Sequence, residues 1–247
     1  MRPLVGTTAA LLCLGSAAAA YVLDATAVFR QFGDAQARSG AQAAHLVGTA
    51  AIGPSGGGAA RAVPFRLDLS FPGACRLEID RPGNPESIAY RGEKVTSPGP
   101  VDPAISAFAS LACPALVLRG MSARAGQAAI AAFAARLAVD RSTVSLARYR
   151  RRATFAVGAK PRDLNRPQIW FDQRSGLPVR IIGTAAGKLW DVRFVDPRSL
   201  ATGRAAPRRI RVFQAQREAL EVDLMTPAPA EGPTTVGDTD GSGSPGD

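Results

Sequence analysis

Histidine and cysteine are scarce in this 247-residue chain, and each shortage excludes a class of chemistry. The single histidine, His45, leaves no second imidazole for a Ser-His-Asp or Cys-His arrangement or for a His-rich zinc site. The three cysteines follow no C-x-x-C spacing, so they predict neither a thiolate metal site nor a redox motif. We therefore expect no metal and no cofactor.

Paired carboxylates are the one catalytic arrangement that this composition leaves open, as in glycosidases. The nearest pair is Glu78 and Asp80, and both fall on the polar face of a predicted strand. A solvated face is the ordinary interpretation of such a pattern, and nothing favours Cys75 or Cys113 as a nucleophile. We expect a protein that is not an enzyme, with a carboxylate-dependent hydrolase as the weakest alternative.

The N-terminus has the pattern of a secretory signal peptide. Arg2 is followed by the short apolar run 4–14 and by the small residues of 16–20, which predicts cleavage near Ala20. A buried N-terminal helix and a lipoprotein signal acylated at Cys13 are the alternatives. A signal peptide predicts export, and we expect the periplasm.

Removal of residues 1–20 leaves two cysteines, Cys75 and Cys113. In an oxidising compartment, two cysteines in one domain favour a disulfide, although two buried thiols remain the alternative.

The net charge of +10 is unevenly placed along the chain. Residues 228–247 hold four acidic and no basic residues and few apolar ones, which predicts a disordered acidic tail. The body, residues 21–227, is strongly basic and nearly all its cations are arginine. Such charge would suit an anionic membrane surface or an acidic protein, although codon bias explains it equally well. No nucleic-acid motif is present, so we expect no nucleic-acid partner.

The apolar pattern predicts strands at both ends of the body and helices near its start and in its middle. Residues 63–71 and 75–79 alternate in period two around Pro72-Gly73, which predicts a hairpin with one apolar face. Helical spacing predicts helices after Asp24, from Pro103 to about 112 with an interruption at Pro114, and over about 124–138. Further strands are expected over 45–52, 87–91, 144–146, 155–157, 169–171, 177–181, 190–194, 210–212 and 220–224.

These elements predict an α+β fold, a curved and mostly antiparallel sheet of ten to eleven strands whose apolar face the helices cover. The pattern does not decide whether a cavity remains between the sheet and the helices.

One stretch of the second half resembles a known family. Pro167-Gln168-Ile169-Trp170-Phe171-Asp172 leads through Ser175-Gly176 to Leu177-Pro178-Val179-Arg180. This strand–turn–strand pattern is similar to that of the LolA/LolB-like outer-membrane lipoprotein carriers. The resemblance extends over about residues 22–226. It implies an unclosed β-barrel, covered by helices, whose apolar face holds the acyl chains of lipids or lipoproteins.

By this resemblance, large apolar residues of the strands and helices would line an acyl-chain site in a periplasmic monomer.

 The candidate lining residues are Phe29, Phe32, Leu67, Leu69, Phe71, Phe108, Ile169, Phe171, Trp190, Val192 and Phe194. Ordinary core packing is the alternative for each of them. An envelope sensor or scaffold that binds a protein segment on the same fold is the alternative function.

Overall fold

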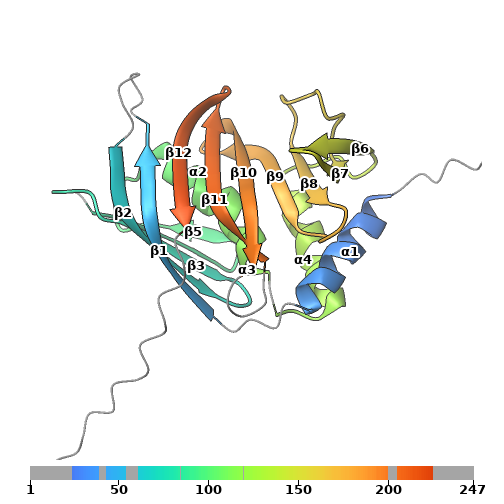
Figure 1. Ribbon diagram of the computed structural model, residues 1–247, viewed down its shortest axis with the longest axis horizontal. Helices are drawn as coiled ribbons and strands as arrows, with labels where there is room; N and C mark the ends of the chain where they lie inside the picture. The colour runs from blue at the N-terminus through green and yellow to red at the C-terminus, as the bar shows by residue number, and fades with distance from the viewer. Residues whose placement is uncertain are drawn as a thin grey trace, which may run out of the picture.

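The computed structural model describes residues 24–38, 43–53, 61–83, 85–118, 120–199 and 205–224 (Figure 1). The predicted signal peptide, residues 1–20, and the predicted acidic tail, residues 228–247, lie outside these ranges.

The described strands form one antiparallel sheet in the order β5-β4-β3-β2-β1-β12-β11-β10-β9-β8-β7-β6. Most neighbours along the sheet are also neighbours in sequence, and β1 pairs with β12, so the first and last described strands lie side by side. The strands are β1 (Ala43–Ile52), β2 (Arg61–Ser70), β3 (Ala74–Ile79), β4 (Glu86–Arg91), β5 (Lys94–Thr96), β6 (Val144–Tyr149), β7 (Arg152–Val157), β8 (Gln168–Asp172), β9 (Pro178–Ala185), β10 (Lys188–Ser199), β11 (Ala205–Gln214) and β12 (Arg217–Leu224).

The α+β fold with an open, curved antiparallel sheet is confirmed, but the sheet has twelve strands where ten to eleven were expected. The additional strand is β5, which pairs with β4 across a turn at Gly92 and Glu93. Both turn residues have positive φ, 53° and 70°, as a two-residue hairpin turn requires. Three residues are too few to show a period-two alternation, so this strand could not be predicted.

The alternation predicted for 63–71 places its residues correctly, except at the end. Phe65, Leu67 and Leu69 are buried, and Leu67 pairs with Leu46 on β1 and Leu77 on β3. Phe71 lies one residue beyond β2, in the turn with Pro72, and packs half-buried against the edge of the core.

A central helical segment fills the concave side of the sheet. It consists of α2 (Pro103–Ala107), the π-helical turn η1 (Phe108–Ala112) and α3 (Cys113–Val117). The predicted cap is confirmed, because the Asp102 carboxylate accepts a hydrogen bond of 2.8 Å from the backbone N–H of Ala104. The segment is apolar on almost all sides, which is typical of a helix buried on all sides.

The predicted interruption at Pro114 is wrong, because the helical path continues to Val117. Proline lacks an N–H and clashes with the carbonyl four residues earlier. Here the preceding turn is widened into a π-helix, in which the N–H of Cys113 reaches the carbonyl of Phe108. The wider turn accommodates the proline without ending the helix.

The other two helices, α1 (Ala25–Ala37) and α4 (Ala123–Arg136), pack against each other at one end of the sheet (Figure 1). Asp24 caps α1 by accepting a hydrogen bond of 2.7 Å from Ala27, and Ser122 caps α4. Within the described ranges, no helix combines the length and the hydrophobicity needed to cross a membrane.

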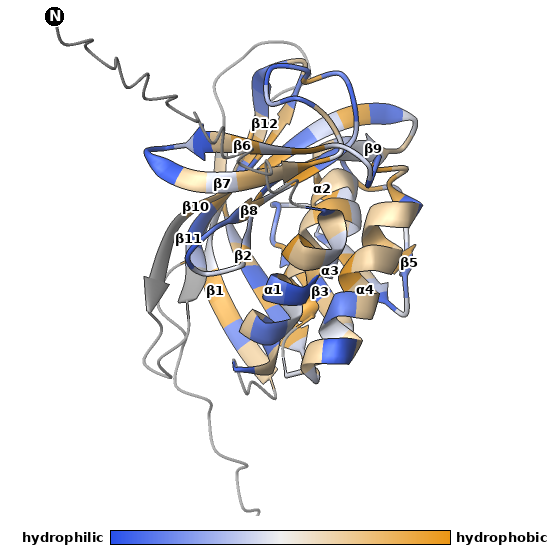
Figure 2. Ribbon diagram, turned by 90° about the vertical axis from the view of Figure 1, so that its right-hand side faces the viewer, coloured by the Kyte–Doolittle hydropathy of each residue, from blue (hydrophilic) through white to orange (hydrophobic). Residues whose placement is uncertain are grey.

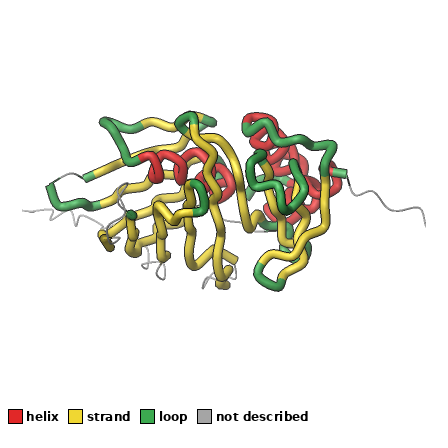
Figure 3. The backbone as a smooth tube through the Cα atoms, turned by 90° about the horizontal axis from the view of Figure 1, so that it is seen from above, coloured by secondary structure: helices red, strands yellow, loops and turns green. Residues whose placement is uncertain are grey.

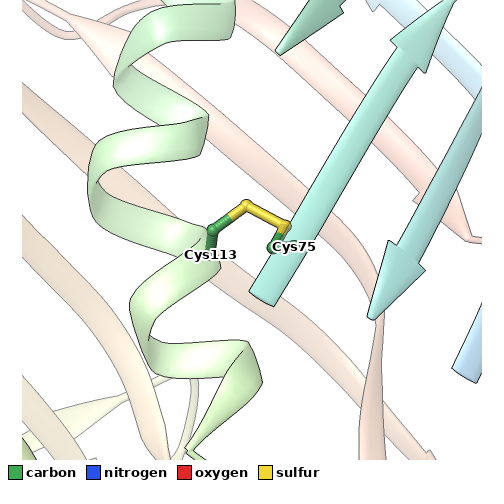
Figure 4. Close-up of a disulfide and its surroundings, with 2 residues drawn as sticks. All are labelled: Cys75 and Cys113. Atoms are coloured by element: carbon green, nitrogen blue, oxygen red, sulfur yellow. A yellow bond between two sulfur atoms is a disulfide. The ribbon is translucent and has the colours of Figure 1, made fainter. Parts of the chain in front are cut away.

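A disulfide joins Cys75 on β3 to Cys113 at the start of α3, with the Cα atoms 5.7 Å apart (Figure 4). The predicted pairing is therefore confirmed. The bond attaches the central helical segment covalently to the sheet, whereas α1 and α4 are held by non-covalent contacts.

The double variant Cys75→Ala/Cys113→Ala should unfold with a free energy about 2–5 kcal/mol below that of the wild type, because the 38-residue separation would no longer be constrained in the unfolded chain. Urea unfolding followed by far-UV circular dichroism measures this difference. Wild-type protein in excess reductant is the control and should approach the variant. Equal midpoints for all three samples would contradict a stabilising role for the bond.

Candidate ligand-binding site

The predicted lining residues come together in the interior, between the sheet and the helices. Ten of the eleven are at most 8% exposed, and Phe71 is half-buried. Viewed from the side, the helices lie against the concave side of the sheet, with hydrophilic stretches on α1 and α4 (Figure 2). Viewed from above, helical segments lie between strands of the curved sheet (Figure 3). These side chains pack against one another in one hydrophobic core, and their role as a ligand lining stays a prediction.

Three phenylalanine rings connect α1 to the sheet. Phe29 and Phe32, one helical turn apart on α1, each meet the ring of Phe171 on β8 edge to face, with centroids 6.0 Å apart. The adjoining β8–β9 turn also contacts α1, because the Gln31 side-chain amide donates a hydrogen bond to the carbonyl of Gln173. α1 therefore contacts both β8 and the β8–β9 turn.

A groove of about 560 Å³ runs between α1 and α4 and is open to solvent on one side. Its volume lies in the range of ligand pockets in proteins. Phe29 contributes to its wall, so the groove reaches the ring cluster at Phe171. The lining residues are Asp24, Ala25, Thr26, Phe29, Arg124, Gln127, Ala128, Ala131 and Arg141. Except for Phe29, the sequence interpretation missed them, because no periodic pattern links residues 24–29 to Arg124 and Arg141.

The β8–β9 hairpin is stabilised by the residues that carry the family resemblance. Asp172 accepts hydrogen bonds from the backbone N–H groups of Arg174 and Ser175, at 3.0 and 2.8 Å, and so fixes the turn. Gly176, with φ of +70°, lies against α1, where an added Cβ would be 2.9 Å from the carbonyl oxygen of Gln31. These motif residues build the hairpin and its contact with α1.

The opposite face of β8 is also buried, under a polar and aromatic cluster. Arg180 donates two hydrogen bonds, of 2.8 and 2.7 Å, to Asp191, and Arg193 donates to the same carboxylate. The Arg180 guanidinium lies 5.1 Å from the centroid of the Trp170 ring, which meets Tyr149 edge to face. Burial raises the pKa of Tyr149. Two guanidinium groups share one carboxylate, so each arginine has an ionic partner and the network keeps one net positive charge.

The carboxylate pair considered for hydrolysis does not converge. Glu78 is engaged by Arg76 at 2.8 Å and Arg66 at 3.5 Å, and Asp80 lies exposed beyond the end of β3. His45 contacts Asp68 on the neighbouring strand, where both side chains are partly exposed. Among the residues that the structure describes, no three His, Cys, Asp or Glu side chains are grouped as metal ligands.

Comparison with known proteins gives structural similarity only. No family model and no curated protein matches the chain. A LolA superfamily protein from Nitrosomonas europaea is 11% identical, with a TM-score of 0.47 over 82% of this chain and 92% of that one. A putative outer membrane lipoprotein-sorting protein domain from Vibrio parahaemolyticus is 11% identical, with a TM-score of 0.46 over 85% and 94%. A DUF1329 family protein from Desulfovibrio piger is 11% identical, with a TM-score of 0.44 over 85% and 95%. At this distance none of the three assigns a role to the chain.

The close approach of α1 and α4 depends on Gly33, where an added Cβ would be 2.2 Å from the carbonyl oxygen of Ala123. Gly33→Ala should lower the free energy of unfolding by about 1–3 kcal/mol, because the backbone clash outweighs the better helix propensity of alanine. Gly99→Ala is the matched control, since no atom lies within 4 Å of its Cβ position. Chemical denaturation measures both variants, and a Gly33→Ala protein more stable than the wild type would contradict the tight crossing.

Proposed function

We propose that this protein is a periplasmic, non-enzymatic binder or carrier of lipid or lipoprotein acyl chains. The observation that carries the proposal is the groove between α1 and α4, whose wall includes Phe29, the ring of which contacts Phe171 edge to face. An acyl chain would enter from the groove and displace α1 from β8, so that it lies against the apolar residues of the concave face. The candidate lining residues would then exchange contacts with one another for contacts with the chain.

The disulfide decides which helices would move in this proposal. The central segment is tied to β3 through Cys113, and its residues are buried between strands on both sides. The α1–α4 pair has no covalent tie to the sheet in the described ranges. Phe29 and Phe32 of α1 contact the Phe171 ring on β8, and Gln31 donates a hydrogen bond to the carbonyl of Gln173 in the β8–β9 turn. Opening would therefore occur at the α1 end of the sheet.

The free energy lost when a ring is exposed and the free energy gained when an acyl chain is buried are of similar size. Exposing one buried phenylalanine costs about 1.5–3 kcal/mol. Each CH₂ group of a bound acyl chain contributes about 0.8 kcal/mol. Burial of about two to four CH₂ groups would therefore offset the exposure of one ring. A longer chain leaves a modest surplus, which suits a carrier that must also release its ligand.

A scaffold or sensor on the same fold is the second candidate, and the tight packing of the interior favours it. Ten of the candidate lining residues are already buried in the packed core. In that case the core would stay closed and a protein segment would bind elsewhere on the surface. Native mass spectrometry of gently purified protein distinguishes the two, because only a carrier should retain lipid.

Phe171→Leu should weaken binding of a fluorescent fatty-acyl probe about tenfold, because the ring would no longer contact the chain. Phe171→Asp should abolish binding. Phe213→Leu is the matched control, because Phe213 lies on the opposite face under Arg193 and should leave binding unchanged. Fluorescence titration gives the Kd of each protein. If folded wild-type protein binds no probe and retains no lipid, the carrier function is wrong and the scaffold takes its place.

A further inference from the structure

We propose that the groove between α1 and α4 binds the anionic head of an amphiphile, a carboxylate or phosphate group, through Arg124 and Arg141. This inference rests on the proposed function and specifies its ligand class. The acyl chain would continue past Phe29 into the interior, while the head group stays in the groove.

Both arginines lack a partner among the described residues. Arg124 and Arg141 are exposed groove residues, and neither forms a hydrogen bond, an ion pair or a ring contact there. Many other arginines of the body are paired, as Arg180 and Arg193 are with Asp191. Two unpaired guanidinium groups at one groove are donors that fit carboxylate and phosphate oxygens.

The acid in the groove lining and the acid that precedes Arg141 are already engaged. Asp24, the one acidic residue of the lining, accepts the capping hydrogen bond of α1 from Ala27. Asp140 precedes Arg141, but its carboxylate accepts hydrogen bonds from Ser142 and Thr143. The Ser142 hydroxyl is the main cause that lowers the pKa of Asp140. The groove therefore keeps a positive balance.

The position of Arg124 is unfavourable for the helix that carries it. It lies in the first turn of α4, where the partial positive charge of the helix dipole disfavours a cation, and no acidic residue accompanies it. A bound anion would remove this repulsion.

The rest of the lining fits the part of the ligand that follows the head. Ala25, Ala128 and Ala131 are small and apolar, and Phe29 lies at the inner wall. Together with the two arginines they make one groove that is cationic and apolar. This combination matches an ionised head group joined to a hydrocarbon chain better than it matches a free anion.

Isothermal titration with dodecyl phosphate and with dodecyl maltoside, both below the concentration at which micelles form, tests the inference. The wild type should bind dodecyl phosphate at least about tenfold more tightly, because charge-assisted hydrogen bonds are added to the same chain contacts. Arg124→Gln/Arg141→Gln should lose that preference and bind the maltoside as the wild type does. Arg91→Gln/Arg217→Gln, which removes two exposed arginines outside the groove, is the control with equal charge and should keep the preference.

Equal binding of both detergents by the wild type would overturn the head-group site and leave the proposed function standing. Equal loss of preference in the two double variants would also overturn it, because net charge would then explain the effect. If inorganic phosphate alone competes as strongly as dodecyl phosphate, the groove is a phosphate site and the amphiphile is wrong. If the wild type binds neither detergent, the proposed function fails and this inference fails with it.

Discussion

The sheet has twelve described antiparallel strands, and their large apolar side chains lie mainly on one face. This wide hydrocarbon surface must be kept from water. The sheet is open, so it cannot cover this surface by closing on itself. The central segment from Pro103 to Val117 fills the concavity and is fixed there by the disulfide to β3. The remaining apolar area near Phe171 is covered by α1, which α4 supports at Gly33 and Gly126. The cover thus has one part that is covalently tied and one that is not.

In the proposed function, only the part of the cover without a covalent tie would move. The tied part behaves as ordinary core. The α1–α4 pair is held by non-covalent contacts in the described ranges, among them the rings of Phe29, Phe32 and Phe171 and the Arg136 guanidinium over the Tyr90 ring. The groove lies between these two helices, with Phe29 in its wall. The strand–turn–strand motif of the second half contributes indirectly, because Asp172 and Gly176 shape the turn that contacts α1.

Much of this fold could be predicted from the sequence, because period-two alternation and helix caps are local signals. The alternation of Phe65, Leu67 and Leu69 predicts which face of β2 is buried. Asp24 and Asp102 predict where two helices begin. The continuation through Pro114 could not be predicted, since it depends on a π-helical turn that the tertiary packing selects. The groove could not be predicted either, because Arg124 and Arg141 meet residues 24–29 only after two distant helices pack.

The central claim, that an acyl chain binds on the concave face near Phe171, is tested most directly by tryptophan quenching. The chain has two tryptophans. Trp190 faces the concave core two strands from Phe171, and Trp170 belongs to the cluster on the opposite face. A brominated fatty acid should strongly quench Trp190 in the Trp170→Phe variant and leave Trp170 nearly unchanged in the Trp190→Phe variant. Equal quenching of both residues, or of neither, would contradict the claim.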